Sequence, residues 1–227
     1  ALDTLNHNIL TNKLKYYGIR NTSLNLCQSY LSNRKQFVTV NNETSSNLNI
    51  SIGVPQGSIL GPFFFLVFVN DLPNCTNSLD FITYADDTTL FTTLNPKLPQ
   101  TNAQLNTEVD KVYTWLCTNK LSLNIAKTKL MNFHTPQRLY TPPKIFIDQE
   151  PVQNVNQYNF LGILIDDNLT WKAHTNKISI KISQITGIIN KLKHIIPQFA
   201  LRNIYNALIL PHLSYGILAW GINNNTI

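Results

Sequence analysis

Two short stretches decide the fold of this 227-residue chain: Gly53–Pro62 reads GVPQGSILGP, and Tyr84–Asp87 reads YADD. The second places two adjacent carboxylates between apolar β-type runs, which predicts a hairpin with the acids at its tip. Adjacent carboxylates repel each other, and a hard divalent cation such as Mg²⁺ relieves that repulsion. The first stretch is a Gly/Pro-rich loop before an apolar helix, so its backbone can approach a flat ligand closely. Each stretch alone is typical of an ordinary turn, but together they predict a metal-dependent phosphoryl-transfer site beside a nucleotide pocket.

The surrounding periodicity predicts an α+β chain. Apolar residues at helical spacing favour helices over 5–17 (ended by Gly18), 22–31 (capped by Asn21 or Thr22) and 101–119, and Pro62 favours a buried helix over 63–72. A hairpin is expected from 36–40 and 48–52 around the polar turn 41–46, and another from 79–84 and 88–94, followed by a loop over 95–100. Short strands are expected at 130–133, 144–147 and 160–165. Trp171, Ile178, Ile182, Ile185, Ile189 and Leu192 then line one face of a long helix, followed by a helix over 197–209 and an apolar segment to Trp220.

The net charge of +6 is unevenly distributed. Residues 1–170 contain twelve Lys/Arg and twelve Asp/Glu, whereas residues 171–227 contain six basic residues and no acid. A basic segment joined to a neutral body indicates an element that binds a polyanion, although a solvated helix face is the alternative. The boundary between the two parts is expected near residues 168–171.

Composition excludes other classes. No apolar run approaches the ~20 residues that a transmembrane helix needs, so no membrane partner is expected. Cys27, Cys75 and Cys117 lack metal-ligand spacing, which argues against zinc and favours buried thiols in a reducing compartment. The chain begins at Ala1, and we expect it to be part of a longer protein.

Four segments carry a specific resemblance: GVPQGSILGP, YADD, LSLNIAKTKLMNF (Leu121–Phe133) and NFLGILIDDNLTW (Asn159–Trp171). In this order they resemble consecutive motifs of reverse transcriptases from non-LTR (LINE, jockey-like) retrotransposons. The opening ALDTLNHNIL is similar to the end of the first palm motif, and ALILPHLSYGILAWG (Ala207–Gly221) to the end of the thumb. The resemblance implies a polymerase palm, an antiparallel sheet with packed helices, over 1–168 with partial fingers, and a helical thumb over 169–227.

The resemblance also implies roles for individual residues. Asp86 and Asp87 would bind two Mg²⁺ (or Mn²⁺) ions, and Lys127 would act on the leaving pyrophosphate. Ala1, Leu2, Gln56, Gly57 and Tyr84 would contact the nucleotide and template, and Phe160, Leu161 and Gly162 the primer end; for Phe160 and Leu161, core packing is the alternative. Lys172, Lys177, Lys181, Lys191 and Lys193 would contact the nucleic-acid backbone. Of these, Lys177, Lys181 and Lys191 are not expected to lie on one strip of the helix, so not all three need contact phosphate. The implied partners are an RNA template, a DNA primer and dNTP; the oligomeric state is unknown.

Two departures from the family pattern matter. The first metal-binding Asp of the opening motif would lie four residues before Ala1, and Asp3 matches a second, non-catalytic acid. Leu2 replaces the usual Phe that blocks a ribose 2′-hydroxyl, so weaker sugar selection is expected. Since the fingers are also largely missing, we expect this chain alone to be an inactive fragment of an RNA-directed DNA polymerase.

Other interpretations stay open at this point. One is a non-catalytic RNA-binding remnant that keeps the fold and the basic thumb. Another is a group II intron maturase or viral RNA polymerase, although the segments 159–171 and 207–221 favour a retrotransposon. The family implies an intracellular location, in the nucleus or the cytoplasm.

Overall fold

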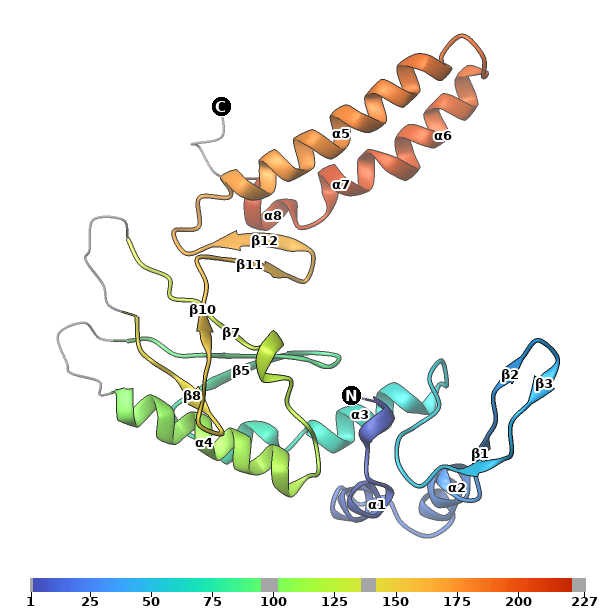
Figure 1. Cartoon of the computed structure of the whole chain (residues 1–227), viewed down its shortest axis with the longest axis vertical. Helices are drawn as coiled ribbons and strands as arrows, with labels where there is room; N and C mark the ends of the chain where they lie inside the picture. Colours follow the sequence, from blue (N-terminus) through green and yellow to red (C-terminus); the bar gives the residue numbers. More distant parts are fainter. Residues whose placement is uncertain (1, 95–101, 136–141, 222–227) are drawn as a thin grey trace. The chain divides into compact units, whose positions relative to one another are not determined.

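The computed structural model describes residues 2–94, 102–135 and 142–221 (Figure 1). The chain divides into two compact units, one comprising Ala1–Thr128 and Pro143–Val152 and the other Lys129–Pro142 and Gln153–Ile227. Residues 153–168 therefore group with the C-terminal helices, whereas the sequence suggested a boundary near residue 168. The division into a palm over 1–168 and a thumb over 169–227 stays a prediction.

Unit 1 combines helices with short hairpins. Its helical elements are η1 (Leu2–Thr4), α1 (His7–Tyr16), α2 (Asn21–Leu31), α3 (Leu60–Val69), η2 (Leu72–Cys75), α4 (Asn102–Thr118) and η3 (Ile125–Lys127). Its strands are β1 (Lys35–Gln36), β2 (Thr39–Val40), β3 (Glu43–Thr44), β4 (Leu48–Asn49), β5 (Asp80–Tyr84), β6 (Asp87–Phe91), β8 (Phe146–Ile147) and β9 (Glu150–Pro151). The expected loop 95–100 lies outside the described residues.

Unit 2 contains the strands β7 (Lys129–Leu130), β10 (Gln153–Asn154), β11 (Gln157–Phe160) and β12 (Ile163–Asp166). The helices α5 (Lys172–Leu192), α6 (Gln198–Leu208), α7 (Leu210–Ser214) and α8 (Ile217–Trp220) follow. Among the described residues all strands occur in two-stranded pairs, antiparallel except for β7 with β10. This mixture of helices and small antiparallel strands agrees with the expected α+β class and with a reverse transcriptase domain, while the continuous palm sheet, the thumb and the missing fingers stay predictions.

Helix α1 illustrates how local signals set the element boundaries. The Asn6 side chain accepts hydrogen bonds from the backbone amides of Asn8 and Ile9, at 3.1 and 3.2 Å. At the other end Gly18 has φ +87°, its amide bonds to the Lys15 carbonyl, and the Ile19 amide bonds to the Leu14 carbonyl. These two bonds form a Schellman motif, in which glycine is favoured because a Cβ is costly at positive φ. The predicted end of this helix is confirmed.

The expected hairpin after α2 is also present, with a tighter turn. β1 pairs with β4 and β2 with β3, and the chain reverses over the two residues Asn41 and Asn42. Their φ angles of +49° and +68° suit a two-residue type I′ turn, which tolerates asparagine. Helix α2 begins at Asn21, preceded by Arg20 without a side-chain cap, so the predicted capping by Asn21 or Thr22 is wrong.

Helix α3 anchors the larger core of unit 1 but is not buried all round. Phe64, Phe65 and Phe68 pack with residues from α1 and α2, including Leu10 and Leu31. On the opposite side, however, Phe63 and Leu66 are 43% and 58% exposed. The expectation of a helix buried on every side is therefore wrong. The helix also begins at Leu60, so Pro62 lies in its first turn rather than at its first position.

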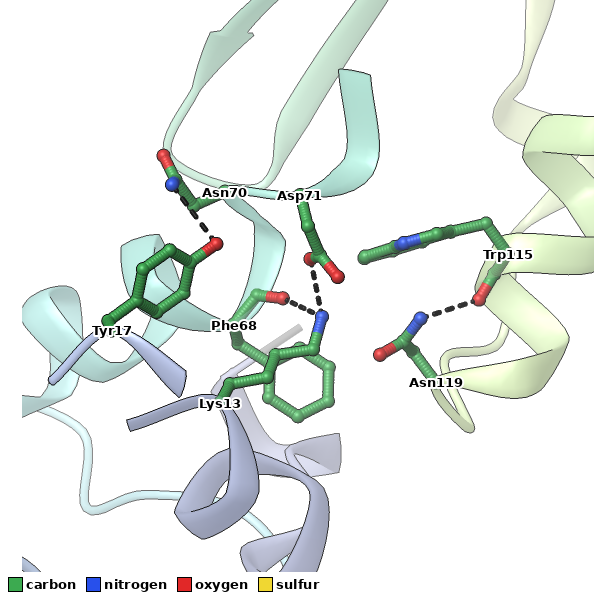
Figure 2. Close-up of polar contacts among 7 residues, drawn as sticks. All are labelled: Lys13, Tyr17, Phe68, Asn70, Asp71, Trp115 and Asn119. Atoms are coloured by element: carbon green, nitrogen blue, oxygen red, sulfur yellow. Dashed lines mark hydrogen bonds and ion pairs between the residues drawn. The ribbon is translucent and has the colours of Figure 1, made fainter. Parts of the chain in front are cut away.

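Lys13 connects this core to a second cluster formed by η2, β5 and α4 (Figure 2). Its Nζ donates to the Phe68 carbonyl at 2.6 Å and to Asp71 Oδ1 at 2.5 Å. The same ammonium lies 4.9 Å from the centre of the Phe68 ring and 4.6 Å from that of Trp115. Burial lowers the pKa of Lys13, while Asp71 opposes that effect. A nearly buried lysine needs such partners, so this contact holds α1, α3 and α4 together.

In unit 2 the predicted single strand 160–165 is wrong. The segment turns at Leu161 and Gly162, and β11 and β12 pair antiparallel on either side. The long helix α5 agrees with expectation: Ile178, Ile182 and Ile185 are partly buried, while its lysines are exposed. α5 contacts α6, α7 and β12 (Figure 1).

The junction between β12 and α5 depends on Asp166, which is only 7% exposed. Its carboxylate accepts from the Thr170 amide at 2.8 Å, the Thr170 hydroxyl at 3.1 Å and the Trp171 amide at 2.9 Å. Burial acts to raise the pKa of Asp166, but these hydrogen bonds outweigh it and leave the pKa lowered. The ionised side chain thus fixes the start of α5.

Candidate functional site

The acids of YADD lie at the end of the β5–β6 hairpin, as predicted. Tyr84 pairs with Asp87, so the reversal uses only Ala85 and Asp86. Ala85 has φ +52°, a left-handed conformation that costs a non-glycine residue roughly 1–2 kcal/mol. All four side chains are exposed. The paired strands therefore hold two carboxylates at an accessible tip.

Both carboxylates are free to take a hard cation. Within the part of the chain that the structure describes, neither the Asp86 nor the Asp87 side chain makes a hydrogen bond or ion pair, and no cluster of three or more His, Cys, Asp or Glu is present. Exposed carboxylate oxygens fit Mg²⁺, which keeps several waters and commonly uses one or two carboxylates plus phosphate oxygens. Two exposed carboxylates are thus available here as ligands for such an ion.

The Gly/Pro loop is attached to the N-terminal segment by backbone contacts. The Gly53 amide donates to the Leu5 carbonyl at 2.7 Å, and the Val54 amide to the Leu2 carbonyl at 3.0 Å. His7 Nε2 lies 2.7 Å from the Gly53 carbonyl, which can only accept, so this nitrogen carries the proton. Gly53 has φ +81°, and a Cβ there would lie 2.6 Å from the Asp3 carbonyl oxygen. Glycine is therefore required where the two segments meet.

Gln56 is held by a partner that the sequence did not reveal. Its Nε2 donates to Asp3 Oδ2 at 2.8 Å. Because a carboxylate only accepts, the amide must turn its nitrogen toward Asp3 and leave its oxygen to other groups. Gly57 has φ +76° and open space beside it. The contact joins residues 53 positions apart, and neither side chain carries a local signal for it.

Over its described ranges, the structure does not bring the remaining residues expected near the nucleotide together with the β5–β6 tip. Leu2 packs against the large core of unit 1 and is partly buried. Ala1 lies outside the described residues. Lys127 ends η3, where the Asn124 side chain caps its amide at 3.1 Å. No hydrogen bond or ion pair joins the Lys127 side chain to the β5–β6 hairpin among the described residues.

The expected primer-binding residues form the β11–β12 turn of unit 2. Phe160 pairs with Ile163, and Leu161 and Gly162 between them have φ +47° and +88°. The Leu161 carbonyl accepts a hydrogen bond from the Tyr215 hydroxyl at 2.6 Å. Tyr215 was not among the predicted site residues, because 54 positions separate it from the turn.

The positive charge of the chain belongs to unit 2. Unit 1 contains ten Lys/Arg and ten Asp/Glu, whereas unit 2 contains eight and two. The five lysines expected to bind the nucleic-acid backbone lie on α5 or at its end and are all exposed: Lys172, Lys177, Lys181, Lys191 and Lys193.

Helix α5 also carries a buried histidine. His174 is 4% exposed; its Nδ1 accepts from the Leu164 amide at 3.2 Å, and its Nε2 has no partner among the described residues. Burial lowers the pKa of His174, and Lys177 adds to the effect. The ring is therefore neutral near pH 7, because protonation would leave a buried charge without a partner.

A cavity of about 680 Å³ lies between α4 and the β8–β9 hairpin, lined by Tyr113 and Asp148 among others, and none of the predicted site residues lines it. The Tyr113 hydroxyl donates a hydrogen bond to Asp148, and this bond raises the pKa of Tyr113 to about 12.

The three cysteines are free, but Cys117 is exposed rather than buried. No described helix combines the length and hydropathy needed to span a bilayer.

Comparison with known proteins gives a consistent result. The sequence model of the family described as reverse transcriptase (RNA-dependent DNA polymerase) matches residues 1–165. The chain is 30% identical over 209 residues to the RNA-directed DNA polymerase from mobile element jockey of Drosophila melanogaster, covering 86% of this chain and 22% of that protein. It is 28% identical over 211 residues to the protein of the same name from Drosophila funebris, covering 88% and 23%. The chain thus spans less than a quarter of the length of these relatives.

Proposed function

Because this chain belongs to the reverse transcriptase family, we propose that it forms part of the nucleotidyl-transfer centre of an RNA-directed DNA polymerase encoded by a non-LTR retrotransposon. The observation that carries the proposal is the pair of unpartnered carboxylates at the β5–β6 tip, within the segment that matches the family. The similarity of this chain to RNA-directed DNA polymerases of the mobile element jockey favours this function over that of a maturase or a viral RNA polymerase.

In the proposed reaction the primer 3′-oxygen attacks the α-phosphorus of a dNTP, and the bond to the β-phosphate oxygen breaks to release pyrophosphate. Asp86 and Asp87 would hold two divalent cations. Bound there, such ions activate the attacking hydroxyl and stabilise the leaving group. Lys127 would neutralise the charge that develops on the pyrophosphate, as basic residues do in phosphoryl transfer.

The other expected residues would position the substrates. Gln56, with its amide oriented by Asp3, and Gly57, with open space beside it, would lie against the nascent base pair, and Tyr84 and Leu2 near the nucleotide. Phe160, Leu161 and Gly162 would contact the primer end. Asp3 would orient Gln56 rather than bind metal, since it matches the non-catalytic acid of the family's first motif and its Oδ2 accepts from Gln56.

Asp86→Ala tests the metal assignment. The protein tested should be the longer polymerase that contains this chain, since the chain covers only 22% of the length of the jockey relative. Loss of a ligand that supplies several kcal/mol of transition-state stabilisation should slow dNTP incorporation on a primed RNA template by at least about 10²-fold.

Asp80→Ala is the matched control, because Asp80 is exposed and lies at the far end of the same strand pair, opposite Phe91. It should leave extension unchanged. Near-normal extension by Asp86→Ala would refute the assignment. If the unmodified protein binds an RNA–DNA hybrid but never extends it, the chain is instead a non-catalytic RNA-binding remnant.

A further inference from the structure

The turn between β11 and β12 is held by a residue from the far end of the chain. The Tyr215 hydroxyl donates to the Leu161 carbonyl at 2.6 Å. A Cβ on Gly162 would lie 3.5 Å from Cε1 of the Tyr215 ring, so the edge of this ring packs against the turn. Both contacts lie within unit 2.

This turn needs external support. Leu161 and Gly162 both have positive φ, as in a type I′ turn, for which asparagine, aspartate and glycine are the favoured first residues. Leucine at φ +47° is strained by contact between its Cβ and the backbone. Such a conformation persists only where the surroundings fix it. The four-pair β11–β12 ladder supplies part of that support, and the bond from Tyr215 constrains the carbonyl of the strained residue itself.

Trp220 and His174 in turn restrict the position of Tyr215. Trp220 Nε1 donates to the Tyr215 carbonyl at 2.9 Å. The Trp220 ring meets the His174 ring edge to face, with centroids 5.5 Å apart, and His174 accepts from the Leu164 amide of β12. These contacts link the β11–β12 hairpin to α5, α5 to α8, and α8 back to the hairpin through Tyr215. They constrain the position from which the Tyr215 hydroxyl donates to the turn.

We propose that Tyr215 is a positioning residue that holds the Leu161–Gly162 turn in the conformation that engages the primer end. The primer assignment rests on the proposed function, whereas the contact between Tyr215 and the turn does not. Tyr215 touches no reacting atom; it acts through the turn. Its loss should therefore weaken primer binding while leaving the chemical step intact.

Tyr215→Phe tests this directly, because it removes one oxygen and keeps the ring. Tyr205→Phe is the matched control: Tyr205 lies on α6 of the same unit, similarly part-exposed, and makes no hydrogen bond through its side chain among the described residues. Hydrogen–deuterium exchange of the peptide 157–166 should accelerate about 2- to 10-fold in Tyr215→Phe, the range expected for one lost hydrogen bond. Tyr205→Phe should exchange as the unmodified chain does.

Primer extension by the longer polymerase that contains this chain is the second measurement. Tyr215→Phe should raise the KM for primer–template about 2- to 10-fold with kcat unchanged at saturating primer. Unchanged exchange in 157–166 would overturn the positioning role. Faster exchange with an unchanged KM would overturn the link to the primer. An unmodified polymerase that binds the hybrid without extending it would refute the proposed function, and exchange would still decide whether Tyr215 holds the turn.

Discussion

Two glycines with opposite surroundings show how strongly backbone geometry constrains single residues in this chain. Gly53 has φ +81° and a Cβ there would meet the Asp3 backbone, whereas Gly187 lies inside α5 with nothing within 4 Å. Gly53→Ala should lower the free energy of unfolding by at least about 1–3 kcal/mol, because it combines a left-handed residue with a clash. Gly187→Ala should raise it by about 0.5–1 kcal/mol through helix propensity. Urea denaturation measures both, and equal effects of the two changes would contradict the geometry at Gly53.

For single residues, the sequence predicted positions that depend on near neighbours in the chain. Asp86 and Asp87 could be placed at a hairpin tip because the acids and the strands that flank them are adjacent in sequence. The contacts of Asp3 and Tyr215 could not be predicted, since each crosses more than 50 residues to a partner with no periodic signal. Hydrogen bonds of this kind depend on the tertiary fold, which periodicity does not specify.

Whole elements were predicted best where caps and periodicity agree. Gly18 forms the cap after α1, and α5 partly buries Ile178, Ile182 and Ile185, both as expected. The β11–β12 hairpin was missed because residues 160–165 read as one apolar strand, with Leu-Gly in place of a typical Asn-Gly turn. The burial of α3 was overestimated because an apolar helix implies a covering partner, and the described residues cover one side only.

The buried histidine of α5 makes the stability of unit 2 sensitive to pH. Its pKa is lowered on folding, so the unfolded chain binds a proton near the ordinary value of 6.5 before the folded chain does. The free energy of unfolding should therefore fall as the pH drops below about 6.5, with a slope of at most about 1.4 kcal/mol per pH unit from this group. Asp166 has a lowered pKa too, but as an acid it contributes stability above about pH 4 and loses it below.

His174→Asn isolates the contribution of His174 to this pH dependence. The asparagine Oδ1 can replace Nδ1 as the acceptor for the Leu164 amide, and asparagine does not titrate. Urea denaturation at pH 5, 6, 7 and 8 should show a smaller loss between pH 7 and 5 in this variant than in the unmodified chain. His194→Asn changes an exposed histidine of the same unit and should keep the original slope. A parallel pH dependence for all three proteins would show that His174 does not titrate differently on folding.

Over the whole molecule the charge is divided as the units are, with unit 1 neutral and all of the net +6 in unit 2. Helix α5 concentrates this charge: at 100° per residue, Lys177, Lys181 and Lys191 lie within an arc of about 80°. The sequence interpretation that these lysines do not share one strip is therefore wrong. The arc faces away from the packed isoleucines such as Ile182 and Ile189, which leaves it open to a polyanion.

Reversing these three lysines to glutamate should weaken binding of the chain to an RNA–DNA hybrid and flatten its salt dependence. Each lost phosphate contact reduces the slope of log K against log salt by about 0.9, so three contacts predict a change of about 2–3. Lys15, Lys35 and Lys120 of unit 1 are equally exposed, and their reversal alters the net charge by the same amount. If the two triple variants lose affinity equally, binding depends on net charge alone. If only the α5 variant reduces the slope of log K against log salt, the α5 lysines contact the nucleic-acid backbone, because only local contacts release counterions.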